Sequence, residues 1–142
     1  MASRLYQRGF KLVMDGDLDI VAVTMNVIFT RTSAHTFSQT HDFFDDLVSP
    51  VGESSGTNYT DGGQLLSDAV DTASAYDAAD TVMTAVASGA ALDSLHIYRE
   101  LTSNALSPLL VYVDGFSIVP NGGDITIQWA ATPNFIFKLA QD

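Results

Sequence analysis

The sequence predicts an all-β protein with a single antiparallel β-sandwich or jelly-roll-like domain, preceded by a short N-terminal helix or arm. Short segments that alternate between apolar and polar residues recur along the chain, and clusters of Gly, Pro, Asn and Asp separate them. The length of 142 residues lies within the range of one domain. We therefore expect residues 1–14 to form the arm or helix and residues 15–142 to form the β domain.

The N-terminal segment is predicted to be an amphipathic helix over residues 3–14, with Ser3 near its N-cap. Tyr6 and Phe10 are four positions apart, and a further apolar residue follows at position 13 or 14. One side of the helix would therefore be apolar. Gly9 weakens this prediction because glycine is a poor helix former.

The longest strand is predicted at residues 20–30, where apolar residues recur at every second position. Residues 31–63 are rich in Thr, Ser, His, Asp and Gly, which is typical of a long surface excursion. We expect one apolar group to hold this excursion against the domain, formed by Phe43, Phe44, Leu47 and Val48.

The middle of the chain is ambiguous, because residues 64–79 have an alanine content and an apolar spacing that also suit a helix. Residues 81–86 are different, since β-branched residues recur there in a two-residue alternation. We expect strands at residues 69–73 and 81–87, and the choice between helix and strand stays open for residues 64–79.

The last third predicts four strands, at residues 95–99, 109–113, 124–129 and 135–139. Turn sequences separate the last three, and the first of these turns is Asp114-Gly115. Ile125, Ile127 and Trp129 share one face of their strand, and polar residues share the other. This apolar face is expected to lie in the core.

The charge distribution argues against nucleic acid and anionic membranes as partners. Six basic residues against seventeen acidic residues give a net charge of −11, which repels phosphate groups. The charge is uneven, because residues 1–14 carry +3 and residues 15–142 carry −14. No run of 18 or more apolar residues occurs, so no membrane partner is expected. The absence of cysteine excludes disulfides and thiolate chemistry.

The best candidates for catalysis or metal binding are two histidines and three aspartates in the excursion: His35, His41, Asp42, Asp45 and Asp46. Their spacing matches no familiar metal motif, and we expect a solvated loop. His96 would point away from its apolar neighbours in a strand, which predicts a histidine at the surface or in an interface.

Other motifs of catalysis and binding are missing from the sequence. There is no nucleophile elbow, phosphate-binding loop or dinucleotide-binding glycine motif. The aspartates of residues 15–19 lack the glycine and the glutamate that a calcium loop requires, so an acidic turn is expected. We therefore expect no catalytic residue, no cofactor and no metal, and we expect that the protein is not an enzyme.

A series of motifs resembles a family of bacteriophage proteins. The most specific are SPLLVYVDGF at residues 107–116 and PNGGDITIQW at residues 120–129. The same order includes GDLDI at residues 16–20, HDFFDDL at 41–47, LHIYR at 95–99 and FIFKL at 135–139. Together they resemble small proteins encoded among the head genes of tailed bacteriophages, a group that includes capsid decoration or cement proteins.

The resemblance implies a structural virion protein, made in the host cytoplasm, that binds the outside of the icosahedral capsid and stabilises contacts between major capsid subunits. The implied partners are the major capsid protein and the chain itself, as a homo-oligomer for which a trimer is favoured over a dimer and the choice between them stays open. An alternative is a head-to-tail connector or tail-associated binding module. A third alternative is a small hydrolase that uses the loop from His35 to Asp46.

Two sets of residues are candidates for binding. The basic N-terminal segment is predicted to be a capsid-attachment arm, in which cations face an acidic seam and aromatic side chains act as anchors: Arg4, Tyr6, Arg8, Phe10 and Lys11. Aromatic residues in loops or turns are predicted to lie in the oligomer interface: Phe43, Phe44, Tyr59 and Phe116.

Overall fold

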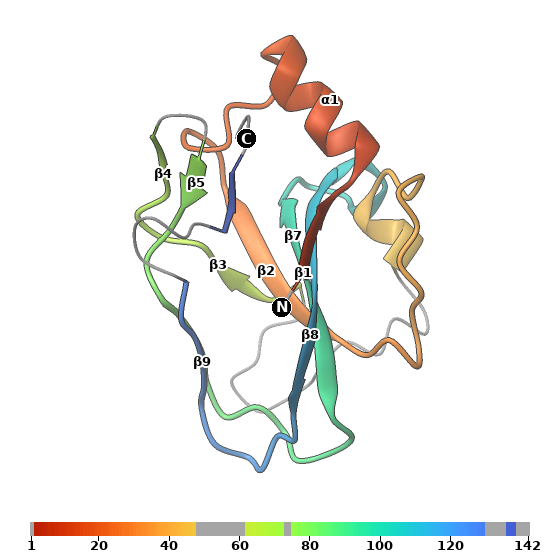
Figure 1. Ribbon diagram of the computed structural model, residues 1–142, viewed down its shortest axis with the longest axis vertical. Coiled ribbons are helices and arrows are strands. Elements are labelled where there is room, and N and C mark those ends of the chain that lie inside the picture. The colour runs from red at the N-terminus through yellow and green to blue at the C-terminus, as the bar shows by residue number, and fades with distance from the viewer. Residues whose placement is uncertain (1, 48–61, 73–74, 130–135, 139–142) are drawn as a thin grey trace.

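The protein is an antiparallel β domain with one α-helix near its N-terminus, as a computed structural model shows (Figure 1). The structure describes residues 2–47, 62–72, 75–129 and 136–138. The prediction of an all-β domain with a short N-terminal helix is confirmed.

A five-stranded antiparallel sheet forms the centre of the fold. Its strands, in spatial order, are β1 (Ala2–Leu5), β8 (Leu109–Ile118), β7 (Leu92–Arg99), β2 (Met25–Thr30) and β3 (Gln64–Leu65). Two smaller sheets consist of β10 (Phe137–Lys138), β5 (Ala75–Asp77) and β4 (Val70–Thr72), and of β6 (Thr81–Met83) with β9 (Ile125–Ile127). The helical segments are α1 (Gln7–Asp15) and two 3-10 helices, η1 (Phe44–Leu47) and η2 (Asn104–Leu106).

The five-stranded sheet is covered on both faces. One face, which we call the apolar face, carries Met25, Val27 and Phe29 of β2 and packs against side chains of the small sheets, including Tyr76 and Met83. The small sheets lie to the left of the large sheet in Figure 1. The core of the domain therefore lies between the large sheet and the small ones, as in a sandwich.

The opposite face of the sheet is covered by the chain that follows β2. We call this segment, residues 31–47 including η1, the covering loop, and the face beneath it the loop-covered face; the loop lies to the right in Figure 1. A second, smaller apolar cluster forms here from residues of the sheet, the N-terminal segment and η1: Tyr6, Ile28, Phe44, Leu47, Tyr98, Leu109 and Tyr112.

The N-terminal segment differs from the predicted helix. Ser3 lies in β1, which pairs with β8, and the helix begins at Gln7 after an N-cap at Tyr6. The first residues form a strand because the edge of β8 offers backbone hydrogen-bond partners. Gly9 is required in α1, since a Cβ atom there would lie 2.1 Å from the carbonyl oxygen of Leu109 in β8. The glycine that weakened the helix prediction thus lets the helix approach the sheet.

The predicted strand at residues 20–30 is shorter in the structure. Strand β2 begins at Met25, and the preceding residues form a turn. The carboxylate of Asp19 accepts hydrogen bonds from the backbone N–H groups of Val21 and Ala22, over 3.1 and 3.0 Å. Local side-chain bonds of this kind compete with strand pairing. All six residues of β2 are buried, because both faces of the sheet are covered.

Further predictions along the chain are resolved by the structure. Residues 64–79 form strands β3, β4 and β5 where they are described. The predicted strand at 81–87 ends at Met83, and Ala85 has a positive φ of 48°. The turn predicted at Asp114-Gly115 is wrong: β8 continues to Ile118, and Gly115, with φ of 84°, lies where the pairing register of β7 and β8 shifts. Its positive φ produces a bulge rather than a turn.

The apolar alternation near the C-terminus is present but lies at the edge of the core. Ile125 and Ile127 of β9 are half-buried, whereas Thr126 is exposed. Trp129 follows the strand, is also half-buried, and donates a hydrogen bond from its indole nitrogen to Oγ1 of Thr81 over 3.1 Å. The strand covers less than the predicted residues 124–129, and residues 135 and 139 of the last predicted strand lie outside the described residues.

Candidate functional site

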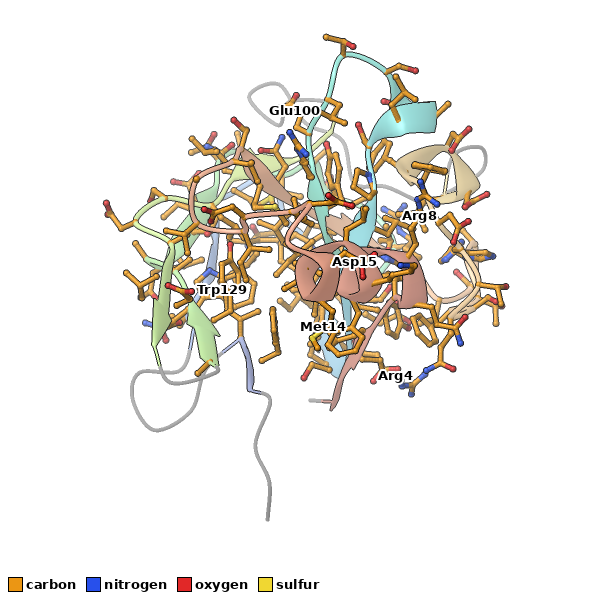
Figure 2. The ribbon with its side chains drawn as sticks, turned by 90° about the horizontal axis from the view of Figure 1, so that it is seen from above. Arg4, Arg8, Met14, Asp15, Glu100 and Trp129 are labelled. Carbon is orange, nitrogen blue, oxygen red and sulfur yellow. The ribbon has the colours of Figure 1, made fainter. Side chains whose placement is uncertain are left out.

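Two of the predicted binding residues, Arg4 and Arg8, lie on one side of the molecule, while Trp129 lies on the other side of α1 (Figure 2). The guanidinium carbon of Arg4 is 5.2 Å from the ring centre of Phe37. The guanidinium carbon of Arg8 is 4.5 Å from the ring centre of Phe43. Both arginines are exposed and both rings are half-buried. We call these four residues the cation–aromatic surface.

The register of β1 positions Arg4. This residue pairs with Tyr112 of β8, and its neighbour Leu5 packs toward the larger core, so that Arg4 lies on the loop-covered face. Nη2 of Arg4 donates a hydrogen bond to Oδ2 of Asp114 over 3.1 Å. The guanidinium carbon also lies 5.6 Å from the ring centre of Tyr112. These contacts hold the charged group above two stacked rings, since Phe37 and Tyr112 lie 4.7 Å apart.

The covering loop positions Phe43. Oδ2 of Asp46 accepts hydrogen bonds from the backbone N–H groups of Asp42 and Phe43, over 2.6 and 3.1 Å, at the start of η1. Phe43 also forms a β-bridge with Pro108, just before β8. The loop is thereby attached to the strand against which α1 packs, and the ring of Phe43 lies under Arg8.

The chemistry of this surface suits a partner with carboxylates and apolar groups. A cation over an exposed aromatic ring contributes about 0.5–1 kcal/mol and leaves the guanidinium donors free for a planar carboxylate. Within the described ranges Arg8 forms no ion pair, whereas Arg4 forms one with Asp114. Such a surface binds through apolar contact and charge-assisted hydrogen bonds together.

The other residues of the predicted attachment arm are arranged differently. Lys11 forms an ion pair with Asp15 one turn along α1, and Phe10 is half-buried. Tyr6 is completely buried, and its backbone N–H donates to the carbonyl oxygen of Leu110 over 3.0 Å. The prediction that Tyr6 is an exposed anchor is therefore wrong, because β1 joins the sheet and draws the next residue into the core. A capsid-binding role of Arg4, Arg8, Phe10 and Lys11 stays a prediction.

The described residues among those predicted for an oligomer interface do not form one patch. Phe44 is buried and stacks on Tyr98, with ring centres 4.3 Å apart. Phe116 is half-buried in β8, against Phe29 on the apolar face. There it lines an open groove of about 320 Å³, together with Ile118 and Ile127. Phe43 belongs to the cation–aromatic surface, and Tyr59 lies outside the described residues.

Three histidines lie together where the covering loop contacts the sheet. The ring centres of His35 and His41 are 5.0 Å apart, and those of His35 and His96 are 5.3 Å apart. His96 is fully buried, which contradicts the prediction that it lies at the surface or in an interface. His35 is 8% exposed, so the predicted solvated loop is wrong for this residue, whereas Asp45 and Asp46 are exposed. His96 does point away from Leu95 and Ile97, but the loop covers that face as well. We call His35, His41 and His96 the histidine cluster.

Hydrogen bonds fix His96 within the sheet. The hydroxyl group of Tyr6 bonds to Nδ1 over 2.8 Å, and Nε2 bonds to Oγ1 of Thr30 over 2.9 Å. Thr30 in turn bonds to the hydroxyl group of Ser94 over 2.7 Å. Either neutral tautomer of the imidazole satisfies both of its nitrogen atoms in this chain of bonds.

Burial and mutual repulsion govern the protonation of the cluster. Burial, followed by the charges of His35 and His41, lowers the pKa of His96 well below its usual value. Burial and His41 lower the pKa of His35, while Asp46 acts in the opposite direction. Burial alone would raise the pKa of Asp46, but its two backbone N–H donors and the neighbouring histidines lower it. Burial also raises the pKa of Tyr6.

Sequence reasoning identified all three histidines but missed Phe37, Tyr112 and the contact of His96 with His35, although one signal was present. His96 alternates with Leu95 and Ile97 in β7, and Tyr112 alternates with its valine neighbours in β8. The two residues are paired in the sheet, which predicts a polar and aromatic stripe on one face. An aromatic-rich segment such as residues 35–44 is a suitable cover for that stripe.

Comparison with known protein families and curated proteins gives no assignment. No protein-family model matches the sequence, and no curated protein matches it. Across residues 2–47, 62–72, 75–129 and 136–138, no three or more His, Asp or Glu side chains are arranged to hold a metal ion. In the same part of the chain, no helix has both the length and the apolar character needed to cross a bilayer.

Proposed function

We propose that the protein is a structural virion protein that binds the outside of a tailed-bacteriophage capsid and stabilises contacts between major capsid subunits. In this proposal it has no catalytic role. The basis is the series of motifs over nearly the whole chain that resembles capsid decoration proteins. The structure adds a candidate surface for attachment, which is the cation–aromatic surface.

One observation carries the choice of this surface. Arg4 and Arg8 came from the predicted attachment arm and Phe43 came from the predicted set of interface aromatics. They form two cation–aromatic pairs, Arg4 with Phe37 and Arg8 with Phe43, and both arginines lie on one side of the molecule. Elsewhere the chain is strongly acidic, with −14 over residues 15–142. A cationic and aromatic site in an acidic protein favours an acidic segment of another protein as its partner.

The expected energetics divide between the two kinds of group. Exposed ion pairs contribute about 0–1 kcal/mol each and are screened by salt, so Arg4 and Arg8 mainly provide orientation and selectivity. Phe37 and Phe43 supply apolar contact area. A homo-oligomer would present several such surfaces to the capsid, and their linkage strengthens attachment by roughly a hundredfold or more. Moderate affinity at each surface is therefore sufficient.

Imaging of purified virus particles tests the proposal directly. We expect density for the protein at symmetry-related positions over the whole outer shell, with the side of α1 that carries Arg8 facing major capsid subunits. Density confined to the single vertex that holds the tail would instead favour the connector or tail-associated alternative. Absence of the protein from intact particles would contradict both.

A further inference from the structure

We propose that the histidine cluster keeps the covering loop closed only while His35 and His96 are neutral, so that acidification releases the loop together with Phe37 and Phe43. Loop release does not depend on the proposed function. Its consequence for attachment, which is weaker binding at acidic pH, also rests on the proposed function.

The cluster joins the loop to the sheet. His35 and His41 belong to the covering loop, whereas His96 belongs to β7 in the centre of the sheet. The loop reaches its position through a turn after β2, in which the backbone N–H groups of Ala34 and His35 donate to the carbonyl oxygen of Arg31. Contact between His35 and His96 is therefore one of the places where loop and sheet meet.

The two sides of the contact differ in their hydrogen bonding. Both ring nitrogens of His96 are bonded, to Tyr6 and Thr30. By contrast, Nε2 of His35 and Nδ1 of His41 are buried and have no hydrogen-bond partner among the described residues. A buried nitrogen without a partner is destabilising, so the loop side is held by packing and is the weaker side. We expect the loop to move and the sheet to stay.

The charged and titratable groups around the cluster can compensate only part of an added positive charge. Asp46 of η1 is the carboxylate that acts on both His35 and His41, and its Oδ2 already accepts two backbone N–H groups. Arg4 of β1 is a further cation, and it forms an ion pair with Asp114 of β8. Other titratable groups near the cluster, within the part of the chain that the structure describes, are Asp42, which follows His41, and the hydroxyl groups of Tyr6 and Tyr112, whose pKa values are raised. A second proton on the cluster therefore meets repulsion from the first, which Asp46 offsets only in part.

The direction of the pH effect follows from this arrangement. A histidine whose pKa is lowered in the closed state binds fewer protons there than in the open state, so closure weakens as the pH falls below the ordinary value of about 6.5. For one histidine that stays neutral when closed and titrates normally when open, the opening constant at pH 5 rises by up to about 30-fold. Two such histidines multiply the effect.

Amide hydrogen exchange at pH 7.5 and pH 5.5, corrected for intrinsic exchange rates, tests loop release in the isolated protein. The loop is reported by the hydrogen-bonded amides of Ala34, His35 and His41, and the sheet by the paired amides of β7 and β8. We expect protection in the loop to fall about tenfold on acidification, while protection in the sheet changes much less. Equal loss of protection in loop and sheet, or no loss in the loop, would overturn the proposal.

Two variants separate the cluster from general effects of acid. His41→Gln removes the half-buried ring that lies 5.0 Å from His35 and lowers its pKa, and we expect it to reduce the pH dependence of loop protection severalfold. Gln39→Ala changes an exposed residue of the same loop and should keep the dependence of the parent protein. Equal pH dependence in both variants would count against the cluster.

Binding to capsids at the same two pH values distinguishes this inference from the proposed function. Loop release with weaker binding at pH 5.5 supports both. Loop release with unchanged binding leaves the histidine cluster as the cause of opening and contradicts the assignment of the attachment surface.

Discussion

The two faces of the five-stranded sheet are built from different residues and are stabilised in different ways. The apolar face consists of aliphatic and aromatic side chains that need only contact to be stable, such as Val27 and Ile97. The loop-covered face contains hydroxyl and imidazole groups that need partners, such as Tyr6 and His96. Burial of polar groups is stabilising only where hydrogen bonds are made, so stability and responsiveness to pH are separated between the faces.

The largest expected effect is on the apolar face. Ile97→Ala removes a completely buried side chain from the central strand β7 and leaves a cavity in the larger core. We expect the free energy of unfolding to fall by about 2–5 kcal/mol, measured by urea denaturation. Leu106→Ala, at a residue that is 58% exposed, is the control and should change the stability little. Equal stability of the two variants would mean that β7 is not central to the core.

A matched pair of substitutions compares the two faces directly. The hydroxyl group of Tyr6 bonds to His96 on the loop-covered face, whereas that of Tyr76 is buried on the apolar face and has no partner among the described residues. Tyr6→Phe should destabilise the protein by about 1–3 kcal/mol, because a ring nitrogen of buried His96 loses its partner. Tyr76→Phe should be neutral or stabilising. Thermal unfolding of both variants at pH 7.5 provides the measurement, and a larger loss for Tyr76→Phe would reverse the comparison.

The same comparison predicts how stability depends on pH. The pKa values of His35 and His96 are lowered in the folded protein, so their contribution is complete above about pH 6.5 and is lost progressively as the pH falls below it. Asp46 has a lowered carboxyl pKa and loses its contribution only at more acidic pH. Unfolding experiments between pH 7.5 and pH 5 should therefore show falling stability. A flat profile over this range would mean that the histidines titrate equally in both states.

The sequence predicts the apolar face well because its signals are local. Alternation of apolar and polar residues located β7, β8 and β9. Where the prediction was wrong, contacts between distant residues decided the structure. The strand at Ser3 depends on pairing with Val113. Gly9 occurs in α1 because the helix lies so close to the backbone of Leu109 that no side chain would fit.

The candidate site was predicted only in part, for the same reason. Charge placement identified Arg4 and Arg8, since the excess of basic residues at the N-terminus is visible in the sequence. The sequence could not place Phe37 under Arg4, nor bring His35 against His96, which is 61 positions further along the chain. Burial of His96 follows from coverage of its face by the loop, and a two-residue alternation reports only the face of the sheet, not its cover.

The cation–aromatic surface should matter for binding much more than for folding. Arg8→Ala removes an exposed contact with Phe43 and should lower the free energy of unfolding by no more than about 1 kcal/mol. Truncation of residues 1–11 is not a suitable test of this surface, because it also removes β1 and the buried ring of Tyr6. Point variants keep the fold and isolate the surface.

Binding of the purified protein to capsids of the same virus that lack it tests the central claim most directly. Arg8→Ala combined with Phe43→Ala should reduce occupancy by tenfold or more at pH 7.5, as an interface anchor and its cation are lost together. Gln128→Glu is the control, because it makes the same change of one unit in net charge at an exposed position next to Trp129, on the other side of α1. This variant should bind like the parent protein. Full occupancy by the Arg8 and Phe43 double variant, with its fold verified by thermal unfolding, would contradict the account.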